Sequence, residues 1–221
     1  MKPVKHLIYR KGSWIKFYCA RKALFEDSTM DNLRKDFLYP PGGILIWIII
    51  SLEVVTFAAG LIAFLVTGQS EKELFALSRP LLDRNIGWIN TIVLLSGGLF
   101  MANAIHSIRE DKSKSSSRWM IAAGLSGITF LVLKCVEYSS KLKGGHDLGS
   151  DSFFTLYWLL TGFHFLHVAL ATVILLVLAG KVQKGQYSQG SHLDLETAGS
   201  FWHMCDLIWL FIFPVVYLLP G

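Results

Sequence analysis

Apolar residues dominate five long stretches of the chain, which short polar segments separate. The stretches run over approximately residues 44–66, 88–108, 119–138, 152–179 and 199–219. Each is about 20 residues long, the length of an α-helix that crosses a hydrocarbon layer of ~30 Å. Short connections predict that neighbouring helices are antiparallel. The pattern therefore predicts an all-α integral membrane protein, with a five-transmembrane-helix bundle over residues 44–221 that follows a basic N-terminal segment.

The composition agrees with this fold class. Of the 221 residues, 52% are hydrophobic and 17% are charged. The isoelectric point of about 9.1 would also suit a protein that binds nucleic acid. However, the basic residues flank the apolar stretches, as they do in membrane proteins, so we expect no nucleic acid partner. The three cysteines form neither a CxxC motif nor a zinc-type spacing.

The distribution of basic residues predicts the orientation in the membrane. Residues 1–43 contain nine of the 21 lysines and arginines, interleaved with aromatic residues, which suggests a cytoplasmic segment at the lipid headgroups or on a partner subunit. The side of the N-terminus carries 15 basic residues in all, the opposite side carries five, and Lys134 lies within a span. We therefore expect a cytoplasmic N-terminus and a periplasmic C-terminus in a bacterial inner membrane.

A carboxyl group lies deep in the first span. Glu53 is nine residues beyond Ile44, which places it roughly 14 Å along the helix. An ionised carboxylate at that depth is costly, so we expect a largely protonated group. Two interpretations stay open, a neutral carboxyl that joins two helices by hydrogen bonds and a proton-related intramembrane carboxylate.

Four further polar residues form a predicted polar cluster in the last two spans. His164 and His167 are three residues apart, as are His203 and Asp206, so each pair shares a helix face. Asp206 needs a partner in the membrane, and His203 is the nearest candidate. We expect interhelical hydrogen bonding or proton handling. We also hypothesise that His203 and Asp206 feed the same cluster as Glu53.

Other polar or small residues in the spans are expected to be structural. Lys134 and Glu137 are three apart in the third span, so Lys134 either reaches toward the headgroups or forms an ion pair with Glu137. Gly162 is expected to let another helix approach closely. Interhelical hydrogen bonds are the expected role of Asn90, Thr91 and Ser96.

The residues reveal no catalytic, cofactor or metal site. Two stacked haems need histidines about 13–14 residues apart on one helix, or roughly 20 Å, and the spacing here is three. We therefore expect no haem and no metal in this chain. A cytochrome b-type electron-transfer subunit that uses His106, His164, His167 or His203 is the alternative. A proton-coupled transporter built around Glu53 is disfavoured, because no internal repeat is visible.

Several motifs in register resemble haem-copper oxidase (cytochrome c oxidase) subunit III. The sequence WLLTGFHFLHV from Trp158 to Val168 resembles the family signature TGFHGLHV, and FWHMCDLIWL from Phe201 to Leu210 resembles YWHFVDVVWLF. The spacing of Trp47, Glu53 and Phe57 resembles the span that holds the family's membrane carboxylate. Further similarities are Asn90-Thr91, Leu94-Leu95-Ser96 and Glu137-Tyr138.

This resemblance implies a non-catalytic subunit without haem or copper of its own. It implies packing on catalytic subunit I, whose metal centres would hold haem and copper or iron, and a role in assembly, sustained turnover and proton uptake. It places the proton-related carboxylate at Glu53. Membrane lipids are implied as partners, although the family's lipid cleft involves two helices that have no counterpart here.

The chain also departs from the family pattern. Five spans replace the seven of the mitochondrial type, and the ending WHMCDLIWLFIFPVVYLL is most similar to the NorE-like accessory branch of nitric oxide reductase. Phe165 stands where Gly is common, and Phe201 where Tyr is common. The first 38 residues lie outside the resemblance. The resemblance therefore leaves either oxygen or nitric oxide as the substrate of the complex.

Overall fold

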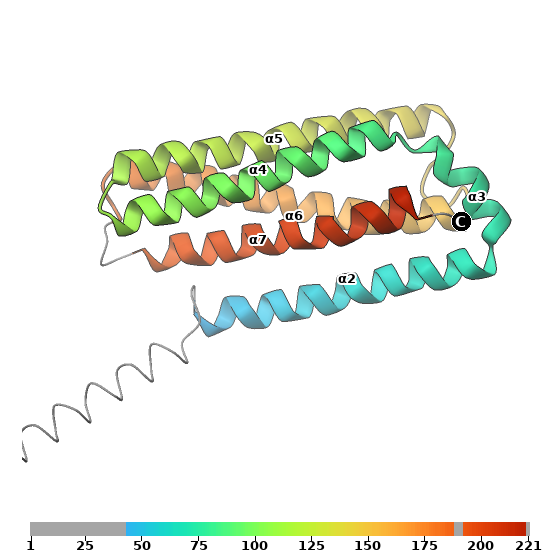
Figure 1. Ribbon diagram of the computed structural model, residues 1–221, viewed down its shortest axis with the longest axis horizontal. Coiled ribbons are helices and arrows are strands. Elements are labelled where there is room, and N and C mark those ends of the chain that lie inside the picture. The colour runs from blue at the N-terminus through green and yellow to red at the C-terminus, as the bar shows by residue number, and fades with distance from the viewer. Residues whose placement is uncertain (1–42, 188–191, 220–221) are drawn as a thin grey trace, which may run out of the picture. The chain divides into compact units, whose positions relative to one another are not determined.

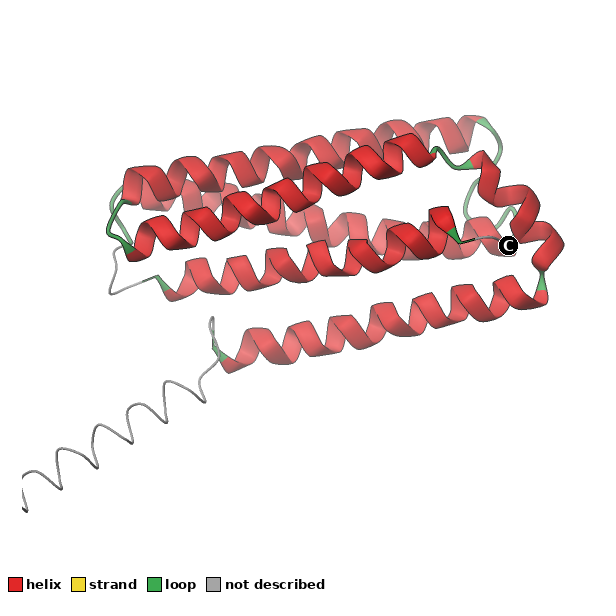
Figure 2. Cartoon of the chain, in the orientation of Figure 1, coloured by secondary structure: helices red, strands yellow, loops and turns green. Residues whose placement is uncertain are grey.

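The computed structural model describes residues 43–187 and 192–219, and those from 43 onward belong to one compact unit. Expectations about residues 1–42 fall outside the described residues. Helices form nearly all of the described chain, without a strand (Figures 1 and 2). The elements are α2 (Ile44–Ser70), α3 (Lys72–Ser78), the 3₁₀ turn η1 (Arg79–Leu81), α4 (Arg84–Arg109), α5 (Ser113–Lys143), α6 (Ser152–Gln183), α7 (Leu193–Phe213) and the π-helical η2 (Pro214–Leu218).

Five of the described helices are long and apolar enough to cross a membrane, which confirms the predicted fold class. They are longer than the apolar stretches that predicted them; α5 and α6 have 31 and 32 residues. Their polar ends continue the helical hydrogen bonding beyond the hydrocarbon region, where apolar patterning no longer marks the helix. Asp83 and Asp151 begin α4 and α6 because their carboxylates accept backbone N–H bonds of the first turn.

The five spans alternate in direction, so one end of the bundle collects the start of α2, the α4–α5 connection, the end of α6 and the start of α7 (Figure 1). We call this end the first side. The second side holds α3, η1 and the end of η2. Helices α4 to α7 pack together, whereas α2 packs mainly on α6 and α7 among the long helices. Only three residues of α2 are buried, Ile46, Phe57 and Phe64.

Small residues let the helices approach closely, although not where the sequence predicted it. A side chain on Gly97 of α4 would collide with Ser126 of α5 and with the indole of Trp202. Gly162 was expected to have this role, but no atom of the described bundle lies within 4 Å of the position of its missing Cβ. That prediction was wrong, since the large rings of Trp158 and Phe165 on the same face of α6 pack on Tyr138 of α5 while nothing approaches Gly162 itself.

Two long basic side chains tie the second side together. Lys141 of α5 donates to the Leu81 carbonyl, and Arg79 of η1 donates to the Leu219 carbonyl. Burial, with the charge of Arg84 as a smaller cause, lowers the pKa of the Arg79 guanidinium below its usual range. The connection between α2 and α4 is thereby fastened to both α5 and the end of the described chain.

Candidate functional site

The deep carboxyl of α2 faces a histidine of α6. Oε2 of Glu53 lies 3.3 Å from Nε2 of His167, and the side chains are 21% and 12% exposed. Oε2 is within ion-pair distance but makes no hydrogen bond to the described residues. Glu53, the carboxylate predicted in the first span, therefore contacts His167 of the predicted polar cluster. This contact links α2 to α6.

The second ring nitrogen of His167 determines what this contact can do. Its Nδ1 lies 2.9 Å from the Phe163 carbonyl oxygen. A carbonyl can only accept a hydrogen bond, so Nδ1 carries a proton, and a neutral imidazole then presents Nε2 as an acceptor toward Glu53. One proton between Nε2 and Oε2 gives either a protonated carboxyl beside a neutral imidazole or a carboxylate beside an imidazolium. The pair can therefore hold a proton without a separate counterion.

Aromatic rings separate this pair from the centre of the bundle. Phe57, one turn beyond Glu53 on α2, is 3% exposed. Its ring lies 5.6 Å from the ring of His167 and 6.1 Å from that of His164. The spacing of Glu53 and Phe57 carried part of the family resemblance. It places a carboxyl group at the edge of the bundle and a buried aromatic ring directly inward of that carboxyl.

His203 and Asp206 meet as the sequence predicted, but apart from Glu53. Nδ1 of His203 lies 3.6 Å from Oδ2 of Asp206, with the His203 side chain 48% exposed and that of Asp206 8% exposed. Gly98 of α4 leaves room for the Asp206 carboxylate, because a side chain there would collide with it. Within the described residues, no hydrogen bond or ion pair joins this pair to Glu53.

His164 forms no hydrogen bond with the other members of the predicted polar cluster. Its side chain is fully buried, and neither ring nitrogen has a partner among the described residues. The ring stacks on Trp209 of α7 at 5.3 Å and meets Phe130 of α5 at 5.7 Å. The four residues predicted as one polar cluster therefore divide into a carboxyl-paired His167, a His203–Asp206 pair and an aromatic-packed His164.

The third span contains the densest polar network. Nζ of Lys134 lies 3.0 Å from Oε2 of Glu137, and both side chains are at most 1% exposed. Tyr217 of η2 accepts from Lys134 at 2.8 Å and donates to Glu137 Oε1 at 2.7 Å. Tyr157 of α6 donates to the same oxygen at 3.0 Å. The prediction of a structural ion pair agrees with this geometry, because nearly every polar atom has a partner.

Sequence reasoning missed the two tyrosines of this network and the aromatic cage around the ammonium group. Four rings lie 5.0–5.4 Å from Lys134 Nζ, those of Tyr138, Tyr157, Trp209 and Tyr217. Tyr157 and Tyr217 belong to other helices, so no spacing within one helix could have indicated them. A usable signal was a buried lysine and glutamate together with tyrosines near the same ends of neighbouring spans.

The predicted interhelical polar residues of α4 behave differently from one another. Thr91 accepts a hydrogen bond from the Trp209 indole at 2.9 Å, which confirms its interhelical role. Ser96 bonds back to the Ile92 carbonyl of its own helix. Asn90 is fully buried, and neither polar atom of its side chain has a partner among the described residues.

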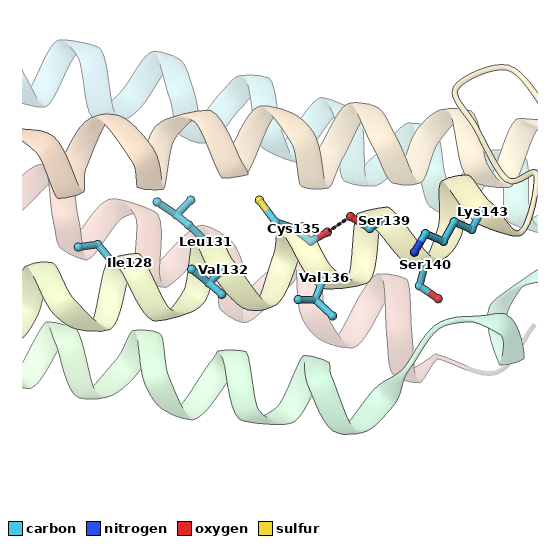
Figure 3. Close-up of a pocket in the computed structure, with 8 residues that line it drawn as sticks. All are labelled: Ile128, Leu131, Val132, Cys135, Val136, Ser139, Ser140 and Lys143. Carbon is cyan, nitrogen blue, oxygen red and sulfur yellow. Dashed lines mark hydrogen bonds between the residues drawn. The ribbon is translucent and has the colours of Figure 1, made fainter.

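The described residues contain no group of three or more His, Cys, Asp or Glu side chains that could hold a metal ion. A surface hollow of about 730 Å³ is an open and mainly apolar groove along α5. Figure 3 shows its lining side chains, which run from Ile128 to Lys143 on this one helix. This groove has no contact with the Glu53–His167 pair.

A five-span helical bundle with the Glu53–His167 pair at its edge and a saturated ion pair in its interior defines a class of polytopic membrane protein. A family model for cytochrome c oxidase subunit III matches residues 23–220, and the chain belongs to this family. The match includes all five spans and part of the basic N-terminal segment. The predicted family is thereby confirmed.

Individual relatives are similar over part of their length. Cytochrome c oxidase subunit 3 of Synechocystis sp. is 33% identical over 141 residues, which cover 63% of this chain and 59% of the relative. The proteins of that name from Spodoptera frugiperda and Drosophila melanogaster are 29% identical over 129 residues, 58% of this chain and 86% and 48% of the relatives. The chain thus spans between about half and three fifths of the cyanobacterial and Drosophila relatives.

Proposed function

We propose that this chain is a non-catalytic, subunit III-type component of a haem-copper respiratory oxidase or nitric oxide reductase complex. It packs on catalytic subunit I, and it supports assembly, sustained turnover and proton uptake. Its five-span form and its C-terminal sequence favour the NorE-like accessory branch within the family. The observation that carries the proposal is the contact between Glu53 and His167 in a chain of this family.

The geometry of that contact explains how a subunit without a metal centre would assist proton uptake. A proton held by either Nε2 or Oε2 would be available at the edge of the bundle, where the Glu53 side chain is 21% exposed. The Nδ1 bond to Phe163 fixes the ring, so that the proton position next to the carboxyl is always Nε2. Such a pair would buffer protons for a neighbouring catalytic subunit.

Purification of the tagged full-length chain from its native membrane tests this function. A catalytic subunit with haem and copper, or with haem and non-haem iron, should accompany the chain in stoichiometric amount. Its identity would decide between oxygen and nitric oxide as the substrate of the complex. Purification of the chain alone, or with a subunit of another class, would contradict the proposal.

We also propose that this chain itself binds no haem and no copper. His167 faces Glu53, His203 faces Asp206, and aromatic rings surround His164. His106 lies 3.4 Å from Glu110 at the end of α4. A Soret band at one haem per isolated chain would instead establish the alternative, a cytochrome b-type electron-transfer subunit.

The proposed location is a bacterial inner membrane, with the first side cytoplasmic and the second side periplasmic. The support is the excess of lysine and arginine on the first side. Alkaline phosphatase fused after Gly221 should be active in a bacterial host, and the same enzyme fused within the α4–α5 connection should be inactive. The reverse pattern, with both fusions well expressed, would overturn this orientation.

A further inference from the structure

A small pocket lies on the second side, where α2 ends and α3 begins. Its volume is about 200 Å³. Apolar side chains form part of its wall, and three residues with polar side chains complete it. The apolar members used below are Phe64, Leu65 and Phe75, and the polar members are Gln69, Lys72 and Arg79.

The guanidinium of Arg79 is the unusual feature of this pocket. The residue is only 6% exposed. One terminal nitrogen donates to the Leu219 carbonyl, while Nε has no partner among the described residues. The pocket thus contains a nearly buried cation with hydrogen-bond donor capacity that the described protein atoms do not use.

The electrostatics of the pocket favour an anion. Lys72 adds a second positive charge, and no carboxylate belongs to the lining. The adjacent Glu71 points its carboxylate to another partner, the Ser152 hydroxyl. A planar guanidinium beside an ammonium group is a donor set that suits the oxygens of a phosphate.

The position of the pocket distinguishes a lipid phosphate from a soluble one. Phe64, Leu65 and Gln69 belong to the last turns of α2, a membrane-spanning helix that ends at Ser70. Just below the pocket, α2 exposes Ile62, Leu65 and Val66, with 59%, 41% and 59% of their surface accessible. An apolar surface that leads into a cationic pocket at the end of a span matches an acyl chain below a phosphate headgroup.

We propose that this pocket binds the headgroup phosphate of an anionic phospholipid, which Arg79 and Lys72 hold while its acyl chain lies on the exposed face of α2. The α5 groove in Figure 3 offers an internal comparison. That groove is larger and also ends in a cation, Lys143, but this lysine is exposed and the lining contains no buried cation. We therefore expect headgroup selectivity at the α2 pocket and none at the α5 groove.

Native mass spectrometry of the full-length chain within its purified complex tests the proposal. The complex is delipidated and incubated with phosphatidylglycerol, with phosphatidylcholine, or with inorganic phosphate as competitor. The wild type should retain one phosphatidylglycerol more tightly than phosphatidylcholine. Lys72→Gln should weaken that binding roughly tenfold, as expected for the loss of one charge-assisted contact. The matched variant Lys143→Gln, in the α5 groove, should leave it unchanged.

Arg79→Gln should abolish the preference for phosphatidylglycerol. Because Arg79 also fastens the Leu219 carbonyl, this variant is interpreted only if the complex assembles. If the Arg79→Gln complex does not assemble, Lys72→Gln still tests the proposal, because Lys72 lies at an exposed position. Equal retention of both lipids by the wild type would overturn the proposal, as would an equal loss in Lys72→Gln and Lys143→Gln. Displacement by millimolar inorganic phosphate would assign the pocket to a soluble anion instead.

Discussion

Two of the carboxyl groups within the described spans, Glu53 and Glu137, have opposite surroundings. Glu137 is buried in the interior, where Lys134, Tyr157 and Tyr217 contact its two oxygens. Glu53 lies at the edge of the bundle, partly exposed, with His167 as its ion-pair partner. Glu137 is saturated with hydrogen bonds, whereas Glu53 has a single ion-pair partner and a partly exposed side chain.

The difference shows that depth in the membrane does not by itself make a carboxyl functional. Glu137 of α5 accepts from tyrosines of α6 and η2 as well as from Lys134, so this carboxyl is suited to holding three elements in place. A group with one titratable partner and an open side can gain or lose a proton at small structural cost. The same residue type therefore serves packing in one region and is proposed to serve proton uptake in the other.

The largest expected effect comes from breaking the interior pair. Lys134→Met should destabilise the bundle by about 3–5 kcal/mol, because it leaves the Glu137 carboxylate buried without its counterion. Adding Glu137→Gln should recover most of the loss, since a neutral amide oxygen can still accept from the tyrosines. Thermal unfolding in detergent measures both. The exposed Lys143→Met is the control, and a double variant as unstable as the single one would contradict this account.

Smaller losses should follow removal of the tyrosine hydroxyls of the same network. Tyr217→Phe removes two hydrogen bonds, and Tyr157→Phe removes one. At about 1 kcal/mol for each bond, the first should cost about twice as much as the second. Tyr138→Phe serves as the control, because that hydroxyl has no hydrogen-bond partner among the described residues although its ring belongs to the same cage. Equal costs for the three variants would show that ring packing, not hydrogen bonding, stabilises the network.

At the edge of the bundle we expect an effect on turnover with little effect on stability. Glu53→Gln keeps the shape of the side chain but removes its titration. The complex should assemble normally, then turn over more slowly or inactivate sooner, most clearly at high pH where protons are scarce. Turnover assays across the pH range measure this, with Glu110→Gln at the exposed α4–α5 connection as the control. Wild-type turnover at every pH would leave Glu53 with a structural role only.

The smallest expected effect is the coupling between Glu53 and Asp206. Sequence reasoning placed the two in one polar cluster, which predicted that Asp206→Asn deepens the high-pH defect of Glu53→Gln by less than additivity. In the structure each carboxyl has its own histidine, and no described hydrogen bond or ion pair connects them. The two substitutions should therefore act additively, within about 0.5 kcal/mol in activation free energy. A clearly larger coupling free energy between the two substitutions, measured by turnover of the double variant, would support a single polar cluster instead.

Much of this architecture could be predicted from the sequence because it depends on local patterns. Apolar stretches long enough to cross a bilayer predicted all five spans, although polar helix ends concealed the full lengths of α5 and α6. Residues three apart on a helix must share a face, which was sufficient to pair Lys134 with Glu137 and His203 with Asp206. Motifs in register predicted the family that the comparison with known proteins then established.

Contacts between helices were decided by the tertiary structure alone. Which helix α2 meets, and at which register, depends on packing across four other spans, so the partnership of Glu53 with His167 has no signal in either segment. The same holds for Tyr157 and Tyr217, which reach Glu137 from α6 and from the end of the described chain. Local sequence determines which residues a helix presents on each face, and only the packed bundle determines what those faces meet.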